Sequence, residues 1–448
     1  HLKRAMALLL AAALFCLSGC SLTPTSMESL LSPPVRTEEQ SEIYQALLSS
    51  VNTNISLVYP RSGEYTSAFV VEDIDGDGLE DALVFYQDQS QATSTTGSVR
   101  MNFLVQRDGD WVSTHDISLQ NATEVEKMQL FEEEGVTYLV VGFNQSSSSE
   151  KLLKVYVYSQ ENGPEERLSE NCSNFTVTDL DGDGVSDLFM ISAPPVSDNT
   201  TREVTGILWK LAQGQFVEDS TVRMNSRAVE YLNINLGWVE SEDVPAIYLD
   251  SQIGTDSEGT EIIRYQDGQL VDLMVGSNAE EDRAASTYRP TGYSCLDLDR
   301  NGCYEIPDPT LFLGYASEDS TQSLSYIVWS NYRRGNLVPV AITYTNYLLN
   351  YHFYLPDSWI GEVSAAWDST TNEITFFRYQ DSLRQQEEVL LKIRVFTRSD
   401  WEGRSPASHY VQLAQNGQLV YSYELFETGS DLDLGDQDIQ ERFTLMDS

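Results

Sequence analysis

The segment Val71-Glu-Asp-Ile-Asp-Gly-Asp-Gly78 occurs three times in related form in this chain of 448 residues. It returns as Thr178-Asp-Leu-Asp-Gly-Asp-Gly184 and again as Leu296-Asp-Leu-Asp-Arg-Asn-Gly302. The first aspartates of the copies, Asp73, Asp179 and Asp297, lie 106 and 118 residues apart. One four-stranded sheet of a repeat protein takes about 40–50 residues. The spacing therefore predicts two sheets per interval, with an acidic loop in every second sheet.

Short β-rich runs between turns fill residues 55–340, for example Ala82–Tyr86 and Leu152–Tyr158. The stretches 122–172 and 225–276 have the same composition but no acidic loop. This pattern predicts a mainly β fold, a β-propeller of about five blades, with six or seven blades as alternatives. The acidic loops would belong to the first, third and fifth blades.

The repeat stops near residue 340, and a different pattern follows. Strand-like runs occur at Ile374–Tyr379 and Val389–Thr397, and Asp436–Met446 has an amphipathic helical pattern with Ile439 and Phe443 on one face. We therefore expect residues 345–448 to form a separate small α+β domain.

Each acidic loop offers oxygen ligands at alternate positions, with glycines that permit a tight turn. The first loop offers the carboxylates of Asp73, Asp75, Asp77 and Asp81 and the carbonyl of Leu79. The second offers Asp179, Asp181, Asp183 and Asp187 with the carbonyl of Val185. The third is degenerate and offers Asp297, Asp299, Asn301 and Glu305 with the carbonyl of Cys303. It has one carboxylate fewer and contains Arg300, so we expect weaker binding there.

Four carboxylates this close would repel one another strongly without a cation. Calcium accepts six to eight oxygens with tolerant geometry, whereas zinc prefers nitrogen or sulfur. The loops are not EF-hands, because position twelve is Val84 in the first and Met190 in the second. Asp308 holds that position in the third, but Pro307 and Pro309 flank it and prevent a helix. The sequence thus predicts Ca²⁺ as the cofactor, with two strong loops and one weaker loop.

With the pattern Asp-x-Asp-Gly-Asp-Gly-x-x-Asp after an apolar strand, residues 66–340 resemble the FG-GAP/VCBS repeats of integrin-type β-propellers. The resemblance implies that the loop aspartates are calcium ligands. The Phe-Gly and Gly-Ala-Pro parts of the family signature are missing, which leaves blade number and closure open. The segment Phe353-Tyr-Leu-Pro-Asp-Ser-Trp359 is similar to the opening of Mog1/PsbP-like domains.

The N-terminus has the features of a bacterial lipoprotein signal. Lys3 and Arg4 precede an apolar run, Ala5–Phe15, that is too short to span a bilayer as a helix. The tetrapeptide Leu17-Ser-Gly-Cys20 resembles a lipobox. We expect a signal peptide at 1–19 and, at 20–54, a lipidated Cys20, a Pro-containing tether and a helix over 38–50 with a Thr37–Gln40 capping box. The protein would be extracytoplasmic and membrane-anchored.

The charge of the chain limits which macromolecules it can bind. The formal net charge of −42 excludes nucleic acid as a partner, because such a surface repels phosphate.

Three cysteines remain once the signal peptide and the lipid anchor are set aside: Cys172, Cys295 and Cys303. Cys295 and Cys303 flank the third loop and could form a disulfide outside the cytoplasm, or stay as two unpaired thiols.

The sequence favours binding over catalysis. It contains no GxSxG, HExxH, GxGxxG or GxxxxGK[ST] pattern, and His115, His352 and His409 are far apart. We therefore predict no catalytic residues and a non-enzymatic surface module that binds a protein or glycan. The first alternative is an extracellular carbohydrate-active enzyme, a glycosidase or lyase, since 69 acidic residues could hide a catalytic carboxylate pair. The second is a structural or assembly factor of the envelope.

Overall fold

The chain is mainly β. The computed structural model describes residues 36–51, 54–89, 98–195, 202–276, 282–316, 323–384 and 386–446. Within these residues the strands form six sheets in which neighbouring strands pair antiparallel, here numbered sheets 1 to 6 along the chain. No helix in the described ranges is long and apolar enough to cross a membrane.

Sheets 1 to 3 each consist of strands that are consecutive in the chain. Sheet 1 contains β1 (Ile55–Leu57), β2 (Phe69–Glu72), β3 (Asp81–Asp88), β4 (Val99–Arg107) and β5 (Asp110–Ser118). Sheet 2 contains β6 (Ala122–Glu133), β7 (Val136–Gln145), β8 (Lys151–Ser159) and β9 (Gly163–Cys172). Sheet 3 contains β10 (Asn174–Thr178), β11 (Asp187–Ser192), β12 (Thr205–Ala212) and β13 (Gln215–Arg223).

Sheets 4 to 6 complete the series. Sheet 4 contains β14 (Ala228–Val239), β15 (Ser241–Ile253), β16 (Ser257–Gln266), β17 (Gln269–Asp272) and β18 (Arg289–Pro290). Sheet 5 contains β19 (Ile306–Leu311), β20 (Ser325–Arg333), β21 (Asn336–Asn346), β22 (Tyr351–Tyr354) and β28 (Phe443–Leu445). Sheet 6 contains β23 (Val363–Asp368), β24 (Glu373–Arg378), β25 (Val389–Thr397), β26 (Val411–Asn416) and β27 (Leu419–Leu425).

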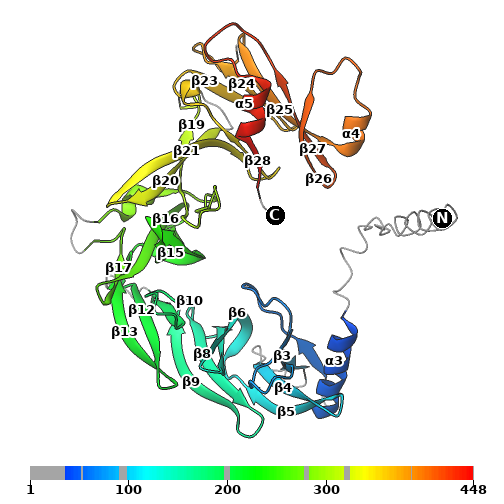
Figure 1. Cartoon of the computed structure of the whole chain (residues 1–448), viewed down its shortest axis with the longest axis vertical. Helices are drawn as coiled ribbons and strands as arrows, with labels where there is room; N and C mark the ends of the chain where they lie inside the picture. Colours follow the sequence, from blue (N-terminus) through cyan, green and yellow to red (C-terminus); the bar gives the residue numbers. More distant parts are fainter. Residues whose placement is uncertain are drawn as a thin grey trace, which may run out of the picture.

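The six sheets follow one another along an open arc, with sheet 1 at one end and sheet 6 at the other (Figure 1). Each sheet shares a buried core with the next. Phe85 and Phe143 belong to the core between sheets 1 and 2, and Tyr138 and Phe175 to the core between sheets 2 and 3. The same holds for each later pair. Burial between neighbouring sheets is therefore the main source of stability in the arc.

Helix α3 (Glu38–Val51) covers the outer face of sheet 1, the first sheet of the described residues. Its buried residues Ile43 and Leu47 pack in one cluster with Phe69 and Tyr86. The predicted capping box is confirmed, because Gln40 N–H donates to Thr37 Oγ1 at 3.1 Å and Thr37 N–H donates to Gln40 Oε1 at 3.3 Å. The other helical segments are short: α4 (Arg398–Glu402), α5 (Asp436–Arg442), η2 (Ala284–Thr287) and η3 (Asp357–Trp359).

The predicted units without an acidic loop are confirmed. Sheet 2 covers Ala122–Cys172, against the predicted 122–172, and the first four strands of sheet 4 cover Ala228–Asp272, against 225–276. These limits follow from the alternation of apolar strands with Gly turns, which the sequence makes visible.

The predicted boundary between 340 and 345 is wrong. It falls inside β21, and the last strand, β28, pairs with β22 through Phe353↔Phe443. The predicted helix over 436–446 also ends early, because residues 443–445 are that strand. Phe443 stacks on Tyr351 with ring centroids 5.4 Å apart. The chain end thus completes sheet 5 instead of belonging to a separate domain.

Candidate metal centres

The first two acidic loops join two strands of sheets 1 and 3, and the third lies between the bridge residues Leu296 and Glu305, directly before β19 of sheet 5. Each loop has eight residues, and the residues that flank it pair across the strands. The loops are 73–80, 179–186 and 297–304, and the flanking pairs are Glu72↔Asp81, Thr178↔Asp187 and Leu296↔Glu305. The predicted position of the loops in the first, third and fifth sheets is therefore confirmed.

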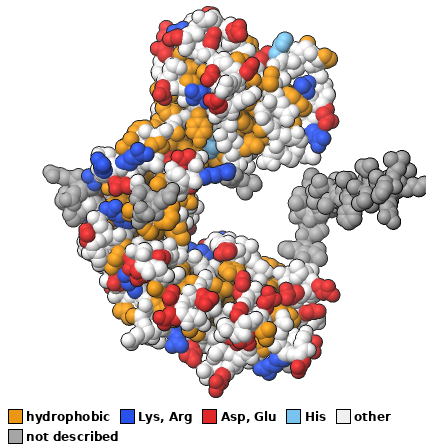
Figure 2. All heavy atoms as spheres, viewed as in Figure 1, with side chains coloured by type: hydrophobic (Ala, Val, Ile, Leu, Met, Phe, Trp, Pro, Cys, Tyr) orange, Lys and Arg blue, Asp and Glu red, His pale blue; other side chains and the backbone are white. Residues whose placement is uncertain are grey.

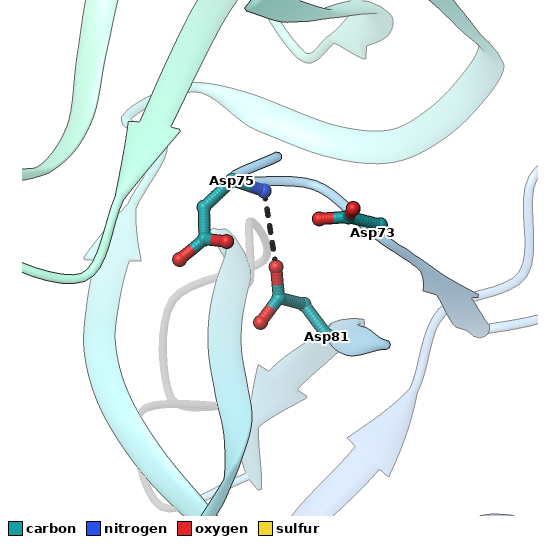
Figure 3. Close-up of side chains that lie close together, drawn as sticks. All are labelled: Asp73, Asp75 and Asp81. Carbon is teal, nitrogen blue, oxygen red and sulfur yellow. Dashed lines mark hydrogen bonds between the residues drawn. The ribbon is translucent and has the colours of Figure 1, made fainter. Parts of the chain in front are cut away.

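Hydrogen bonds from the backbone fix the acids of the first loop, and Figure 3 shows the one from Asp75 N–H to Asp81. Asp73 accepts from Gly76 N–H at 2.7 Å and from Gly78 N–H at 2.9 Å. The closing acid, Asp81, accepts from the N–H groups of Ile74 and Asp75, both at 3.1 Å. Gly76 and Gly78 have φ of 77° and 87°, in the region that glycine adopts without strain. The backbone thus winds around the carboxylates.

The same bonds recur in the other two loops. Gly184 and Gly302 donate to Asp179 and Asp297 at 2.9 and 2.8 Å, as Gly78 does to Asp73. Leu180 and Leu298 donate to the closing acids Asp187 and Glu305 at 3.2 and 2.8 Å. Although its sequence is degenerate, the third loop therefore keeps the geometry of the other two, and the longer Glu305 takes the place of an aspartate.

Each loop brings three acids together. One carboxylate oxygen from each acid lies within 4.8 Å of the others in the groups Asp73–Asp75–Asp81, Asp179–Asp181–Asp187 and Asp297–Asp299–Glu305. These groups could hold a metal ion.

The remaining predicted ligands lie outside these groups and bond to the backbone. Asp77, Asp183 and Asn301 each accept from the N–H two residues on, that of Leu79, Val185 or Cys303, at 2.8, 2.8 and 2.6 Å. Asp77 also accepts from Gln160 Nε2 at 3.1 Å. In this structure these three side chains therefore shape the turn.

The closing acids are the buried members of the groups. Asp81, Asp187 and Glu305 are each 2% exposed. Burial, together with the negative charge of Asp75, Asp181 or Asp299, raises the pKa of each of these acids to about 7. A buried carboxylate beside other carboxylates is stabilised by a cation, which would return its pKa to the acidic range.

Loops 1 and 3 are held by a neighbouring loop-free sheet. Thr137 Oγ1 of sheet 2 donates to Asp73 O at 3.4 Å, and a Cβ at Gly76 would lie 3.3 Å from Gly135 O. In sheet 4, Trp238 N–H donates to Gly302 O at 2.8 Å. Loops 1 and 3 are therefore each tied to the neighbouring sheet at one point, while much of each loop stays exposed.

Lys210 distinguishes the second loop. From β12 its ammonium group pairs with the carboxylate of Asp181. Burial raises the pKa of Asp181, but the hydrogen bond and charge of Lys210 outweigh this and lower it. Sequence reasoning missed Lys210, because it lies 29 residues from Asp181 and no local pattern points to it.

The suggested disulfide does not form, and Cys172, Cys295 and Cys303 are free thiols. Cys295 lies in a buried network, where its N–H donates to Asp250 Oδ2 at 2.9 Å and its thiol contacts Thr260 Oγ1 at 3.3 Å. Cys303 lies at the end of the third loop and is partly exposed. The loop geometry holds the two thiols in different surroundings.

No protein-family model matches the sequence, and no curated protein matches it. Among solved structures, similarity is found to a rhamnogalacturonan lyase from Bacillus licheniformis, with 12% identity over 83% of this chain and 90% of that chain and a TM-score of 0.30. An exo-beta-1,3-galactanase from Phanerochaete chrysosporium has 11% identity over 80% and 82% and a TM-score of 0.29. Sucrose-6-phosphate hydrolase from Lactobacillus gasseri has 10% identity over 90% and 88% and a TM-score of 0.30. These scores are too low to establish a shared fold, so we infer nothing from them.

Proposed function

We propose that this chain is an extracytoplasmic, calcium-stabilised binding module on a propeller-type scaffold, with a protein or glycan as its ligand. The observation that carries this proposal is the threefold recurrence of an eight-residue loop that gathers three carboxylates within 4.8 Å. The succession of antiparallel sheets with a shared core between neighbours is what successive propeller blades would also show, although the arc is open and does not close into a ring (Figure 1).

Calcium fits these loops better than other cations. The candidate ligands are all oxygens, and they come from a winding turn that does not impose the strict octahedron that magnesium demands. Zinc would require nitrogen or sulfur ligands. When bound, calcium would neutralise the repulsion between Asp75 and Asp81 and between their counterparts, and so stabilise the contact of each loop with its surroundings.

Binding is favoured over catalysis because the clustered acids would be occupied as ligands. Elsewhere in the described residues, Glu261 and Asp272 form a close carboxylate pair, but they are 1% and 5% exposed and do not reach a substrate. The acidic side chains visible in Figure 2 are spread over both arms of the arc instead of gathering in one cleft. A glycosidase or lyase activity and an envelope assembly role remain the alternatives.

The experiment that tests the function combines capture and turnover. The purified protein should retain an envelope protein or glycan in a pull-down with calcium and lose it with chelator, and should release no product from polysaccharides in either condition. Product release that one Asp or Glu substitution outside the loops abolishes would replace the binding proposal with the enzyme alternative.

The membrane anchor is a separate part of the proposal. Cys20 lies outside the described residues, so its lipidation rests on the Leu17–Cys20 pattern alone. Cys20→Ala should move the protein from the membrane fraction to the medium or leave it unprocessed. Unchanged membrane association would contradict lipidation.

A further inference from the structure

In sheets 1, 3 and 5, one residue of the next strand lies directly opposite the closing acid. In sheet 1, Asp81 pairs with Val105 of β4. In sheet 3, the ladder of β11 and β12 starts one residue after Asp187 and brings Lys210 opposite it. Directly opposite residues of an antiparallel pair point to the same face of the sheet. Because Lys210 pairs with Asp181 of the second loop, a side chain at this position can contact the clustered acids.

In sheet 5 this position belongs to Asn331 of β20. The ladder of β19 and β20 starts with Ile306↔Ser330, which brings Asn331 opposite Glu305. Burial raises the pKa of Glu305, and a hydrogen bond from the Asn331 amide limits that rise. The amide therefore lies beside the closing carboxylate of the third acidic group.

The Asn331 side chain is buried and only partly satisfied. It is 7% exposed, and its Oδ1 accepts no hydrogen bond in the part of the chain that the structure describes. A buried acceptor without a partner is destabilising, and calcium takes amide oxygens as ligands. A half-turn of the amide exchanges its nitrogen and its oxygen. The group that donates to Glu305 without a cation can therefore offer its oxygen to a cation.

The third loop is the one that lacks a ligand. Asn301 stands where the other loops have Asp77 and Asp183, so the third loop has one carboxylate fewer. The Asn301 oxygen also accepts from Cys303 N–H at 2.6 Å. Calcium takes about six to eight oxygens, so a ligand from outside the loop would help to complete its shell.

We propose that Asn331 Oδ1 is a further ligand of calcium at the third loop, beside the carboxylates of Asp297, Asp299 and Glu305. The inference rests on the proposed calcium binding and names a residue outside the repeated motif that supports it. The amide oxygen adds a ligand but no charge. The third site thus gains affinity from Asn331 and still binds more weakly than the first two.

The other two sheets have no ligand at the equivalent position. The Val105 side chain contains no oxygen, and Lys210 carries a charge of the same sign as the ion. A substitution of Asn331 should therefore change calcium binding at the third site and leave the first two sites as they are.

The test uses the full chain with the first two loops weakened by Asp75→Asn and Asp181→Asn together. Titration calorimetry with calcium then measures the third site. In this background Asn331→Ala should weaken calcium binding about tenfold, which corresponds to about 1.4 kcal/mol. Asn331→Asp adds a charged ligand and should tighten binding about tenfold.

Asn102→Ala is the matched control in the same background. Asn102 of β4 is also buried with an unpaired Oδ1, and its Nδ2 also donates to an acid, Asp116, at 2.8 Å. It belongs to none of the three acidic groups and faces none of their closing acids. Asn102→Ala should therefore leave the calcium affinity of the third site unchanged, and melting curves of both alanine variants report the loss of a buried amide.

The sign of the effect separates a ligand from a donor. If Asn331 only donates to Glu305, Asn331→Ala frees the carboxylate and leaves calcium binding unchanged or tighter, which would overturn the inference. Should Asn331→Ala not fold, Asn331→Asp decides, and an affinity no tighter than that of the background would overturn it as well. Absence of calcium binding in the background has the same consequence.

A melting experiment on the unsubstituted protein keeps the two proposals apart. If calcium raises the melting temperature of that protein while the Asn331 variants bind calcium as the background does, only the role of Asn331 fails. If calcium and chelator give the same melting curve, the proposed calcium binding itself fails.

Discussion

The sheets differ in the segment that leads into one of their strands. This segment is a short turn in sheets 2 and 4 and a longer acidic loop in sheets 1, 3 and 5. In sheet 2 the turn after β6 consists of Glu134 and Gly135, with φ of 53° and 76° and Glu133 paired with Val136. In sheet 4, Val239 pairs with Ser241 around Glu240 alone. In sheets 1 and 3 eight residues with several acids make the same connection, and before sheet 5 eight such residues lie between the bridge residues Leu296 and Glu305. A turn of one or two residues is sufficient to connect two neighbouring strands. The acidic loops are therefore not needed for the connection itself, and their clustered charge must have another role.

The contrast also separates two kinds of stability. A short turn is stabilised by its own backbone conformation. An acidic loop without a cation holds carboxylates that repel one another, so a bound cation as proposed would stabilise it. The first prediction is therefore that chelation lowers the melting temperature. With calcium at ten times Kd, each occupied loop adds about 1.4 kcal/mol to the free energy of unfolding, or about 4 kcal/mol for three.

Thermal melts with calcium, with magnesium and with chelator measure this effect. Calcium should raise the melting temperature more than magnesium, because the loops do not impose octahedral geometry. A melt that is indifferent to chelator would remove the metal assignment and leave the odd-numbered loops unexplained.

The second prediction separates the loops from one another. Asp75→Asn and Asp181→Asn should each remove most of the roughly 1.4 kcal/mol contributed by one loop, whereas Asn301→Ala should remove less, because Asn301 carries no charge. The same Asp75→Asn protein should melt no lower than the parent in chelator, since the substitution relieves repulsion on Asp81. An equal loss of the calcium response in all three variants would contradict a weaker third loop.

The third prediction concerns the loop-free sheet 4, where Glu261 and Asp272 form a buried acid pair. Burial, and then the charge of Glu261, raise the pKa of Asp272 well above its usual value, and burial raises the pKa of Glu261. Glu261 accepts from Asn225 N–H and Tyr231 Oη, and Asp272 from Met274 N–H and Val275 N–H, while Asp282 adds negative charge. With a raised folded pKa, the pair contributes full stability below the unfolded pKa of about 4 and loses it as pH rises through the folded pKa.

The raised pKa values mean that the two acids together keep a proton, which we call the shared proton. Asp272→Asn should therefore stabilise the protein by about 1 kcal/mol at alkaline pH and little at about pH 4, because the amide N–H takes the place of that proton. Its Oδ1 can still accept from the two N–H groups. Denaturant unfolding across this pH range gives the measurement, and Glu218→Gln on the exposed side of β13 serves as control. A stability change that is independent of pH would contradict the shared proton.

The fourth and smallest effect is expected at Lys210. Lys210→Met removes an internal cation from Asp181 and should tighten calcium binding at the second loop about two- to fivefold, equivalent to about 0.5–1 kcal/mol. Lys154→Met, which breaks the comparable pair with Glu166, should leave calcium binding unchanged. Weaker binding in Lys210→Met would show that Lys210 supports the loop instead of competing with calcium.

The sequence by itself determined the local features. The Asp-x-Asp pattern with glycines predicted three acidic clusters that the structure does form, because acids within nine residues of one another are brought together by local backbone geometry alone. The alternation of strands and turns located the loop-free sheets, and Thr37 and Gln40 located the start of α3. These features depend on interactions between residues close together in the chain.

Only the tertiary structure decided the features that join distant residues. The pairing of β22 with β28 connects residues about 90 apart in the chain, and it removed the predicted domain boundary and shortened the predicted final helix. The contact of Lys210 with Asp181, the separation of Cys295 from Cys303 and the position of Asn331 beside Glu305 arise in the same way. Register between strands and packing between sheets place these side chains, and neither leaves a periodic signal in the sequence.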